Sequence, residues 1–222
     1  MTDRTPPSTL RLVLVPSLVT LAVSAARTWM EIDGRVTRAS GGAGSWLGIT
    51  WLALLFGGWF GVRLAAAGDR PRLRPAPLWF GIATAVLIGA VIAVFRHLDP
   101  ADRSPEALRI LDAGAPWVAA AALAMAGLAL VTWTRLAWAL LVYGAIARIT
   151  VVAITWWVKR AGHDTHYTKF GPPGFEFDLA ETMGRAALAQ LAFWVPFTIV
   201  VGGFTGTVAA ALARRLGILS RG

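Results

Sequence analysis

Residues 136–158 read LAWALLVYGAIARITVVAITWWV, an unbroken apolar run that carries a single charge, Arg148. At a rise of 1.5 Å per residue, a helix of this length measures about 35 Å, and the hydrocarbon layer of a bilayer is roughly 30 Å thick. The stretch therefore predicts a transmembrane helix with one polar site inside it.

Five further apolar runs of similar length surround this one. The chain has 222 residues, of which only 15% are charged, whereas soluble domains carry about 25%. The segments between the runs are too short to form a packed core of their own. We therefore expect one all-α membrane domain over residues 1–222, a polytopic integral membrane protein built as a bundle of six transmembrane helices. The expected spans lie at about residues 10–30, 46–67, 78–95, 116–133, 136–158 and 187–213.

The positions of the charged residues predict the orientation. If the N-terminus is inside, the inner segments contain a compact basic cluster, Arg70, Arg72 and Arg74, and only two acids, Asp3 and Asp69. Arginine in short flanking segments favours the cytoplasmic side. We therefore expect both termini in the cytoplasm and the chain in the cell (inner) membrane.

The N-terminus also resembles a secretory signal, because Arg4 and Arg11 precede an apolar run and the small residues 24–26. Cleavage there would leave five spans. The apolar run continues nearly to Met30, which favours a retained first span. The sequence lacks asparagine and uses arginine almost to the exclusion of lysine, a bias that indicates a bacterial genome rich in G and C.

The net charge of +9 does not indicate nucleic-acid binding here. Much of the excess flanks the apolar runs, where arginine sets orientation and meets anionic lipid headgroups. The expected partners are the lipid bilayer and those headgroups. The absence of cysteine excludes disulfides, thiolate metal ligands and cysteine nucleophiles.

The outer segments contain signals for short interfacial helices. Ser104-Pro105-Glu106 combines a serine cap with proline at the first helical position, and Asp178 with Glu181 forms a capping-box-like start. The first of these predicts a short helix on the membrane surface. Gly171-Pro172-Pro173-Gly174 interrupts any helix in the outer loop 159–186, and Pro196 predicts a bend in the last span.

Three residues of this outer loop, His163, Asp164 and His166, are candidate ligands for zinc or copper. His97 or Asp99 would complete the set if the second and third outer loops met. Histidine and aspartate in a loop rich in glycine and proline more often form turn hydrogen bonds. No other cofactor is predicted, because no span contains the histidine pair that a membrane haem needs.

Arg148 is the most informative residue for function. An arginine at mid-span costs about 2.5 to 3.5 kcal/mol on insertion scales, so it requires a partner, and no span offers an acid. In one interpretation it binds an anionic substrate within a polar site that includes Thr155, Gln190 and Thr198. In the other it donates hydrogen bonds to the last span and only holds helices together, a common role for internal polar groups.

Two glycine runs, Gly57-Gly58-Trp59-Phe60-Gly61 and Gly202-Gly203-Phe204-Thr205-Gly206, each contain GxxxG. This spacing permits close approach of helix backbones. We expect Gly57, Gly61, Gly202 and Gly206 to form tight helix contacts, within one protomer or between protomers of a homo-oligomer or membrane complex.

Three functional hypotheses follow. The first is a transporter or channel-like protein for an anionic or lipid-like substrate, because an acid-free buried arginine among small residues suits an anion. The second is a non-catalytic subunit or assembly factor of a membrane complex, because paired intramembrane carboxylates and a base for a nucleophile are missing. The third is a metal-dependent membrane enzyme that uses the outer His/Asp group.

Overall fold

The computed structural model describes residues 8–38, 48–96, 104–170 and 174–219, and within these ranges it is all-α. Three of its elements follow one another without a break and form one continuous helix, Leu179–Arg215. In chain order the elements are α1 (Thr9–Ile32), α2 (Thr50–Ala66), α3 (Ala76–Phe95), α4 (Pro105–Thr132), α5 (Thr134–Arg160), a 3₁₀ turn η2 (His166–Thr168), α6 (Leu179–Ala187), a π-helix η3 (Leu188–Trp194) and α7 (Val195–Arg215).

Five of the described helices, all except α2, are long and apolar enough to cross a membrane. The chain is therefore a multi-pass helical membrane protein, which confirms this part of the prediction. α2 is shorter than the span expected at 46–67, because it has 17 residues and measures about 26 Å. Its start at Thr50 follows Gly48, a poor helix former, and Trp46 lies outside the described residues.

The helix α4 corrects one expectation. Ser104 caps it as predicted, since the backbone N–H of Ala107 donates to Ser104 Oγ over 3.2 Å. The separate surface helix predicted at this point is wrong, because α4 continues through Pro116 to Thr132. A proline inside a helix removes one backbone donor, and membrane helices tolerate this loss.

The last helix contains a π-helix just before Pro196, the residue from which a bend was predicted. Asp178 caps its start, where the N–H of Glu181 donates to Asp178 Oδ1 over 2.8 Å. The residues Leu188–Trp194 then adopt π-helical hydrogen bonding immediately before Pro196. Because proline has no N–H, the carbonyl one turn earlier loses its partner, and a π segment is one way for the backbone to adjust.

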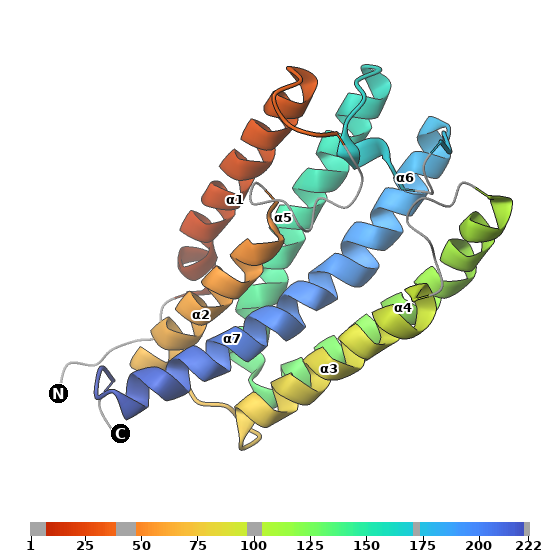
Figure 1. The fold of residues 1–222 in the computed structure, drawn as a ribbon. Coiled ribbons are helices and arrows are strands. Elements are labelled where there is room, and N and C mark those ends of the chain that lie inside the picture. Colours follow the sequence, from red (N-terminus) through yellow and green to blue (C-terminus); the bar gives the residue numbers. More distant parts are fainter. Residues whose placement is uncertain (1–7, 39–47, 97–103, 171–173, 220–222) are drawn as a thin grey trace.

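The continuous helix lies at the centre of the bundle (Figure 1). Its α7 part contacts α2, α3, α4 and α5, while α1 packs against α5 and α3 packs against α4. α4 and α5 are separated by Trp133 alone, where the chain reverses direction. The beginning of α1 and the end of α7 lie at the same end of the molecule.

The closest helix contact joins α2 and α7 through the two glycine runs. A Cβ atom on Gly57 would overlap the backbone carbonyl of Gly202, and one on Gly61 would overlap that of Gly206. Thr205 Oγ1 also donates to the backbone carbonyl of Leu54 on α2 over 2.9 Å. The two glycine faces therefore meet each other within one protomer.

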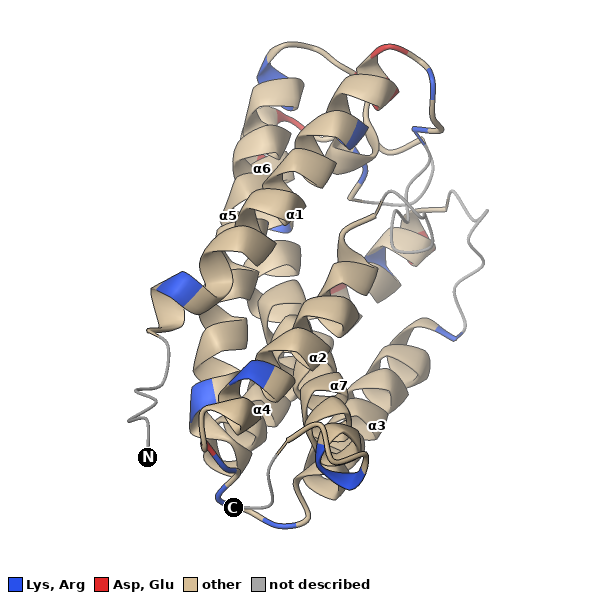
Figure 2. Cartoon of the chain, turned by 90° about the vertical axis from the view of Figure 1, so that its left-hand side faces the viewer, with Lys and Arg blue, Asp and Glu red and all other residues tan. Residues whose placement is uncertain are grey.

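Charged residues concentrate at the two ends of the bundle (Figure 2). Lysine and arginine lie at both ends, whereas Asp and Glu lie mainly at the end opposite the start of α1 and the end of α7. We call the end where α1 begins and α7 ends the basic end, because the cluster Arg70, Arg72 and Arg74 lies there between α2 and α3. At this end Asp69 accepts a hydrogen bond from Trp133 Nε1 over 2.6 Å and pairs with Arg135 at 3.4 Å.

Candidate anion-binding site

Arg148 lies in α5 and faces the π-helix of the last span. Its side chain is 5% exposed. Nη1 donates to Gln190 Oε1 over 3.3 Å, and Cζ lies 4.8 Å from the ring centroid of Trp194. Nε is buried without a hydrogen-bond acceptor in the described part of the chain. Among the described residues no carboxylate pairs with this guanidinium, so its charge is not neutralised by the protein there.

A small cavity of about 170 Å³ adjoins Arg148. Its walls come from α1, the start of α2, α5, the segment around η2, and η3. No acidic side chain is among its described lining residues. The ionisable and amide side chains among its described lining residues are those of Arg27, Arg148, His166, Tyr167, Lys169 and Gln190.

Two of these basic groups, Arg27 and His166, contact a buried carboxylate, that of Glu31. It is 0% exposed, and its Oε1 accepts a hydrogen bond from Arg27 Nε over 2.8 Å. Its Oε1 also lies 2.6 Å from His166 Nδ1, and its Oε2 accepts the backbone N–H of His166 over 2.9 Å. Glu31 therefore fixes the segment around η2 to the end of α1.

Tyr167 fixes the same segment through apolar contacts. Its ring is buried against Val151 and Val158 of α5 and against partly buried side chains that include Ile32. Burial raises the pKa of the Tyr167 phenol, so the group stays protonated and uncharged at neutral pH. The segment around η2 is thus fixed in place by Glu31 and Tyr167, and it covers the cavity beside Arg148.

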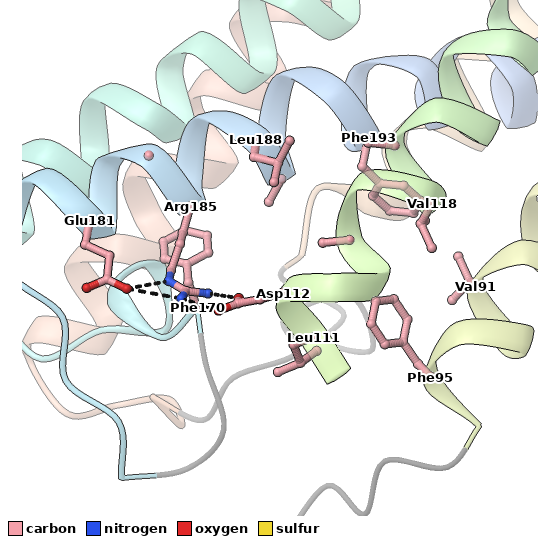
Figure 3. Close-up of a pocket in the computed structure, with 14 residues that line it drawn as sticks. Val91, Phe95, Leu111, Asp112, Val118, Phe170, Glu181, Arg185, Leu188 and Phe193 are labelled. Atoms are coloured by element: carbon pink, nitrogen blue, oxygen red, sulfur yellow. Dashed lines mark hydrogen bonds and ion pairs between the residues drawn. The ribbon is translucent and has the colours of Figure 1, made fainter. Parts of the chain in front are cut away.

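A second, larger cavity of about 560 Å³ lies on the other side of the π-helix (Figure 3). Side chains of α3, α4 and the last helix line it, and most of them are apolar. At one edge Arg185 forms a bidentate pair with Asp112, with N–O distances of 2.6 and 3.0 Å, and a further contact of 3.1 Å to Glu181. We call it the apolar cavity and the smaller one the basic cavity.

The structure brings together only some of the residues predicted for the substrate site. Arg148 and Gln190 are in contact and line the basic cavity. Thr155 and Thr198 are buried but do not line it, and each hydroxyl donates to a carbonyl of its own helix, Val151 and Trp194 respectively. Serine and threonine in helices commonly form this bond to the residue four positions earlier.

The three predicted metal ligands have different neighbours in the structure. The His163 ring lies 5.6 Å from that of Trp157, Asp164 pairs with Lys169 at 3.0 Å, and His166 faces Glu31. No group of three or more His, Asp or Glu side chains that would suit a metal ion occurs in the described ranges. His97 and Asp99, named as further ligands, lie outside the described residues.

Four residues of the site were not identified from the sequence: Arg27, Glu31, Lys169 and Trp194. Arg27 and Glu31 follow the i, i+4 spacing of a helical ion pair. That spacing at the end of an apolar helix was a signal available in the sequence. Lys169 and Trp194 reach the basic cavity only through the packing of the outer loop and the π-helix, which no local pattern indicates.

The basic cavity contains side chains of the kind that can bind an anion. A guanidinium presents several donors in a fixed plane and remains charged at all relevant pH values, which suits phosphate and carboxylate groups. Searches of protein-family models, curated proteins and solved structures returned no match to this chain.

Proposed function

We propose that this membrane protein binds an anionic or lipid-like substrate in the basic cavity and conducts it as a transporter or channel-like protein. One observation carries the proposal. Arg148 lies at mid-span and is 95% buried, it has a hydrogen bond to Gln190 and a ring contact with Trp194, and the described lining of the cavity beside it contains basic but no acidic side chains.

Burying the positive charge of Arg148 costs free energy. A buried charge without a partner is strongly unfavourable, and breaking a buried ion pair costs about 3–5 kcal/mol. The cation–π contact with Trp194 offsets up to about 2 kcal/mol. An anion bound in the basic cavity would neutralise the charge of Arg148. Such a ligand would also explain why this position holds an arginine, since glutamine or asparagine would be sufficient for packing alone.

The proposed orientation places the basic end of the bundle in the cytoplasm, with both termini inside. The compact cluster Arg70, Arg72 and Arg74 supports this placement through the positive-inside rule. The basic cavity then opens toward the outer side, beneath the segment that Glu31 holds. A substrate would enter when that segment moves away from α1.

Flux into proteoliposomes tests the proposal. The protein is reconstituted and assayed with chloride, inorganic phosphate and a fluorescent anionic phospholipid. We expect flux of at least one of these to be abolished by Arg148→Gln and partly retained by Arg148→Lys, which keeps the charge but loses the planar fork. Arg109→Gln is the matched control, because Arg109 is an exposed arginine on α4 paired with Glu106.

Two results would overturn the proposal. One is wild-type flux equal to that of empty liposomes for all three substrates. The other is flux that stays at the wild-type level in both Arg148→Gln and Arg148→Lys, because the buried positive charge would then play no part in transport.

A further inference from the structure

We infer that the substrate is an anionic amphiphile whose headgroup binds in the basic cavity while its hydrocarbon chain occupies the apolar cavity. This inference rests on the proposed function and narrows its substrate class from anionic or lipid-like substrates to anionic lipids. The observation behind it is that two cavities of opposite character share one wall.

The shared wall consists of the π-helix and Phe170. Gln190 and Trp194 line the basic cavity, whereas Leu188, Ala189 and Phe193 line the apolar cavity. Phe170 lines both cavities, and Figure 3 shows its ring behind Arg185 at the edge of the apolar one. The Phe170 ring thus lies between the two cavities, and a ligand that occupied both would have to extend past it.

The charges at the two cavities determine which cavity binds the headgroup and which binds the hydrocarbon chain. At the edge of the apolar cavity, one guanidinium, that of Arg185, is shared by the two carboxylates of Asp112 and Glu181. This edge has a net negative charge and repels an anionic headgroup. The basic cavity offers Arg148, which pairs with no carboxylate of the described residues, whereas Lys169 at its edge pairs with Asp164. The headgroup therefore belongs at Arg148.

The apolar cavity suits a hydrocarbon chain in size and lining. Its 560 Å³ lies within the roughly 300–1,000 Å³ typical of small-molecule sites. Small residues such as Ala115, Ala119 and Gly184 leave the space open, and Phe95 and Phe193 border it. An inorganic anion would leave this cavity unused, whereas an amphiphile fills both.

Photolabelling tests the inference. The probe is dodecyl phosphate with a diazirine at the end of its chain, added to the protein in phosphatidylcholine nanodiscs, and labelled peptides are mapped by mass spectrometry. We expect labelling within residues 111–119 and 188–193. An excess of unlabelled dodecyl phosphate should displace it at a concentration at least tenfold lower than inorganic phosphate.

Two variants and a control separate the chain site from the headgroup site. Ala115→Phe and Ala189→Phe fill the apolar cavity and should each reduce labelling at these residues at least tenfold. Ala120→Phe adds the same ring at an exposed position of α4 outside the cavity and should label like the wild type. Arg148→Gln should weaken probe binding at least tenfold.

The outcomes distinguish this inference from the proposed function. Labelling spread over the lipid-facing helices and equal in all variants overturns the inference, since the chain would then lie only in the surrounding lipid. If radiolabelled inorganic phosphate still binds the wild type but not Arg148→Gln, the proposed anion site stands without the apolar site. If neither probe binds, both are overturned.

Discussion

At the scale of single residues, three charged side chains, those of Arg27, Glu31 and Arg148, are buried in the described part of the chain, and they are held in two different ways. Glu31 accepts hydrogen bonds from Arg27 and from the backbone of His166, and it faces the His166 ring. Arg148 has one amide acceptor and one aromatic ring. The first arrangement is that of a structural tie, in which both carboxylate oxygens have a partner. The second leaves hydrogen-bonding capacity for a ligand.

We predict that Glu31→Gln loosens the cover of the basic cavity. The change leaves Arg27 buried without its carboxylate, and breaking a buried pair costs about 3–5 kcal/mol of stability. Hydrogen–deuterium exchange should show faster exchange at residues 163–170, because the backbone N–H of His166 donates to this side chain. Thermal denaturation in detergent should show a lower midpoint.

Asp33→Asn provides the control for this prediction. Asp33 follows the end of α1 and pairs with Arg35, but its side chain is 44% exposed. Exposed pairs contribute about 0–1 kcal/mol, so this variant should match the wild type in both assays. Equal exchange of residues 163–170 in Glu31→Gln and wild type would show that Glu31 does not hold the segment.

At the scale of elements, the lengths of the apolar runs were sufficient to predict five of the helices. The caps at Ser104 and Asp178 were also predictable, because a capping side chain acts on backbone N–H groups within its own first turn. Pro116 misled the prediction of α4, because its ring removes one hydrogen bond that a membrane helix tolerates. Pro196 indicated a bend in the last span, but no pattern in the sequence indicated that a π-helix would precede it.

The site was predictable to a smaller extent than the helices. The sequence identified Arg148 and Gln190 as polar residues of facing spans. It did not indicate that Thr155 and Thr198 would turn to their own backbone. The sequence also did not indicate that His166 would contact Glu31, because the two residues are 135 positions apart and no local pattern links residues across such a distance.

The contact between α2 and α7 yields a prediction about stability. Gly57→Ala and Gly61→Ala each place a Cβ against the backbone of α7. Overpacking of this kind costs about 1–3 kcal/mol, and a backbone cannot rotate away as a side chain can. We expect a lower midpoint of thermal denaturation in detergent for both variants.

Gly58→Ala is the matched control on the same helix. Its Cβ would lie 3.7 Å from the Cβ of Ala209, an ordinary contact. Alanine is also the better helix former, so this variant should be as stable as the wild type or slightly more stable. Equal stability of all three variants would contradict a tight glycine contact between α2 and α7.

At the scale of the whole molecule, the continuous helix Leu179–Arg215 organises the bundle. Its N-terminal half carries the π-helix that lies between the two cavities, and its α7 part packs the glycine run against α2. Acidic side chains lie mainly toward the end of the bundle opposite the basic end, whereas lysine and arginine lie at both ends. The continuous helix therefore contributes to the candidate site in one half and to the packing of the bundle in the other.

The proposed orientation predicts which side each end of the bundle faces. The chain has no cysteine, so single cysteines report accessibility without background. Ala161→Cys, after the end of α5, should react with a membrane-impermeant maleimide from outside intact cells. Leu73→Cys, at the basic end, should react only after permeabilisation. The reverse pattern would place the termini outside and contradict the orientation.

The central claim is that the buried guanidinium of Arg148 is neutralised by a bound anionic ligand and not by the protein. A cryo-electron microscopy map of the protein in lipid nanodiscs tests this claim most directly. The account predicts non-protein density within hydrogen-bonding distance of Arg148 in the basic cavity, absent from a map of Arg148→Gln. A cavity without ligand density, with Arg148 paired to a carboxylate of the protein, would contradict it.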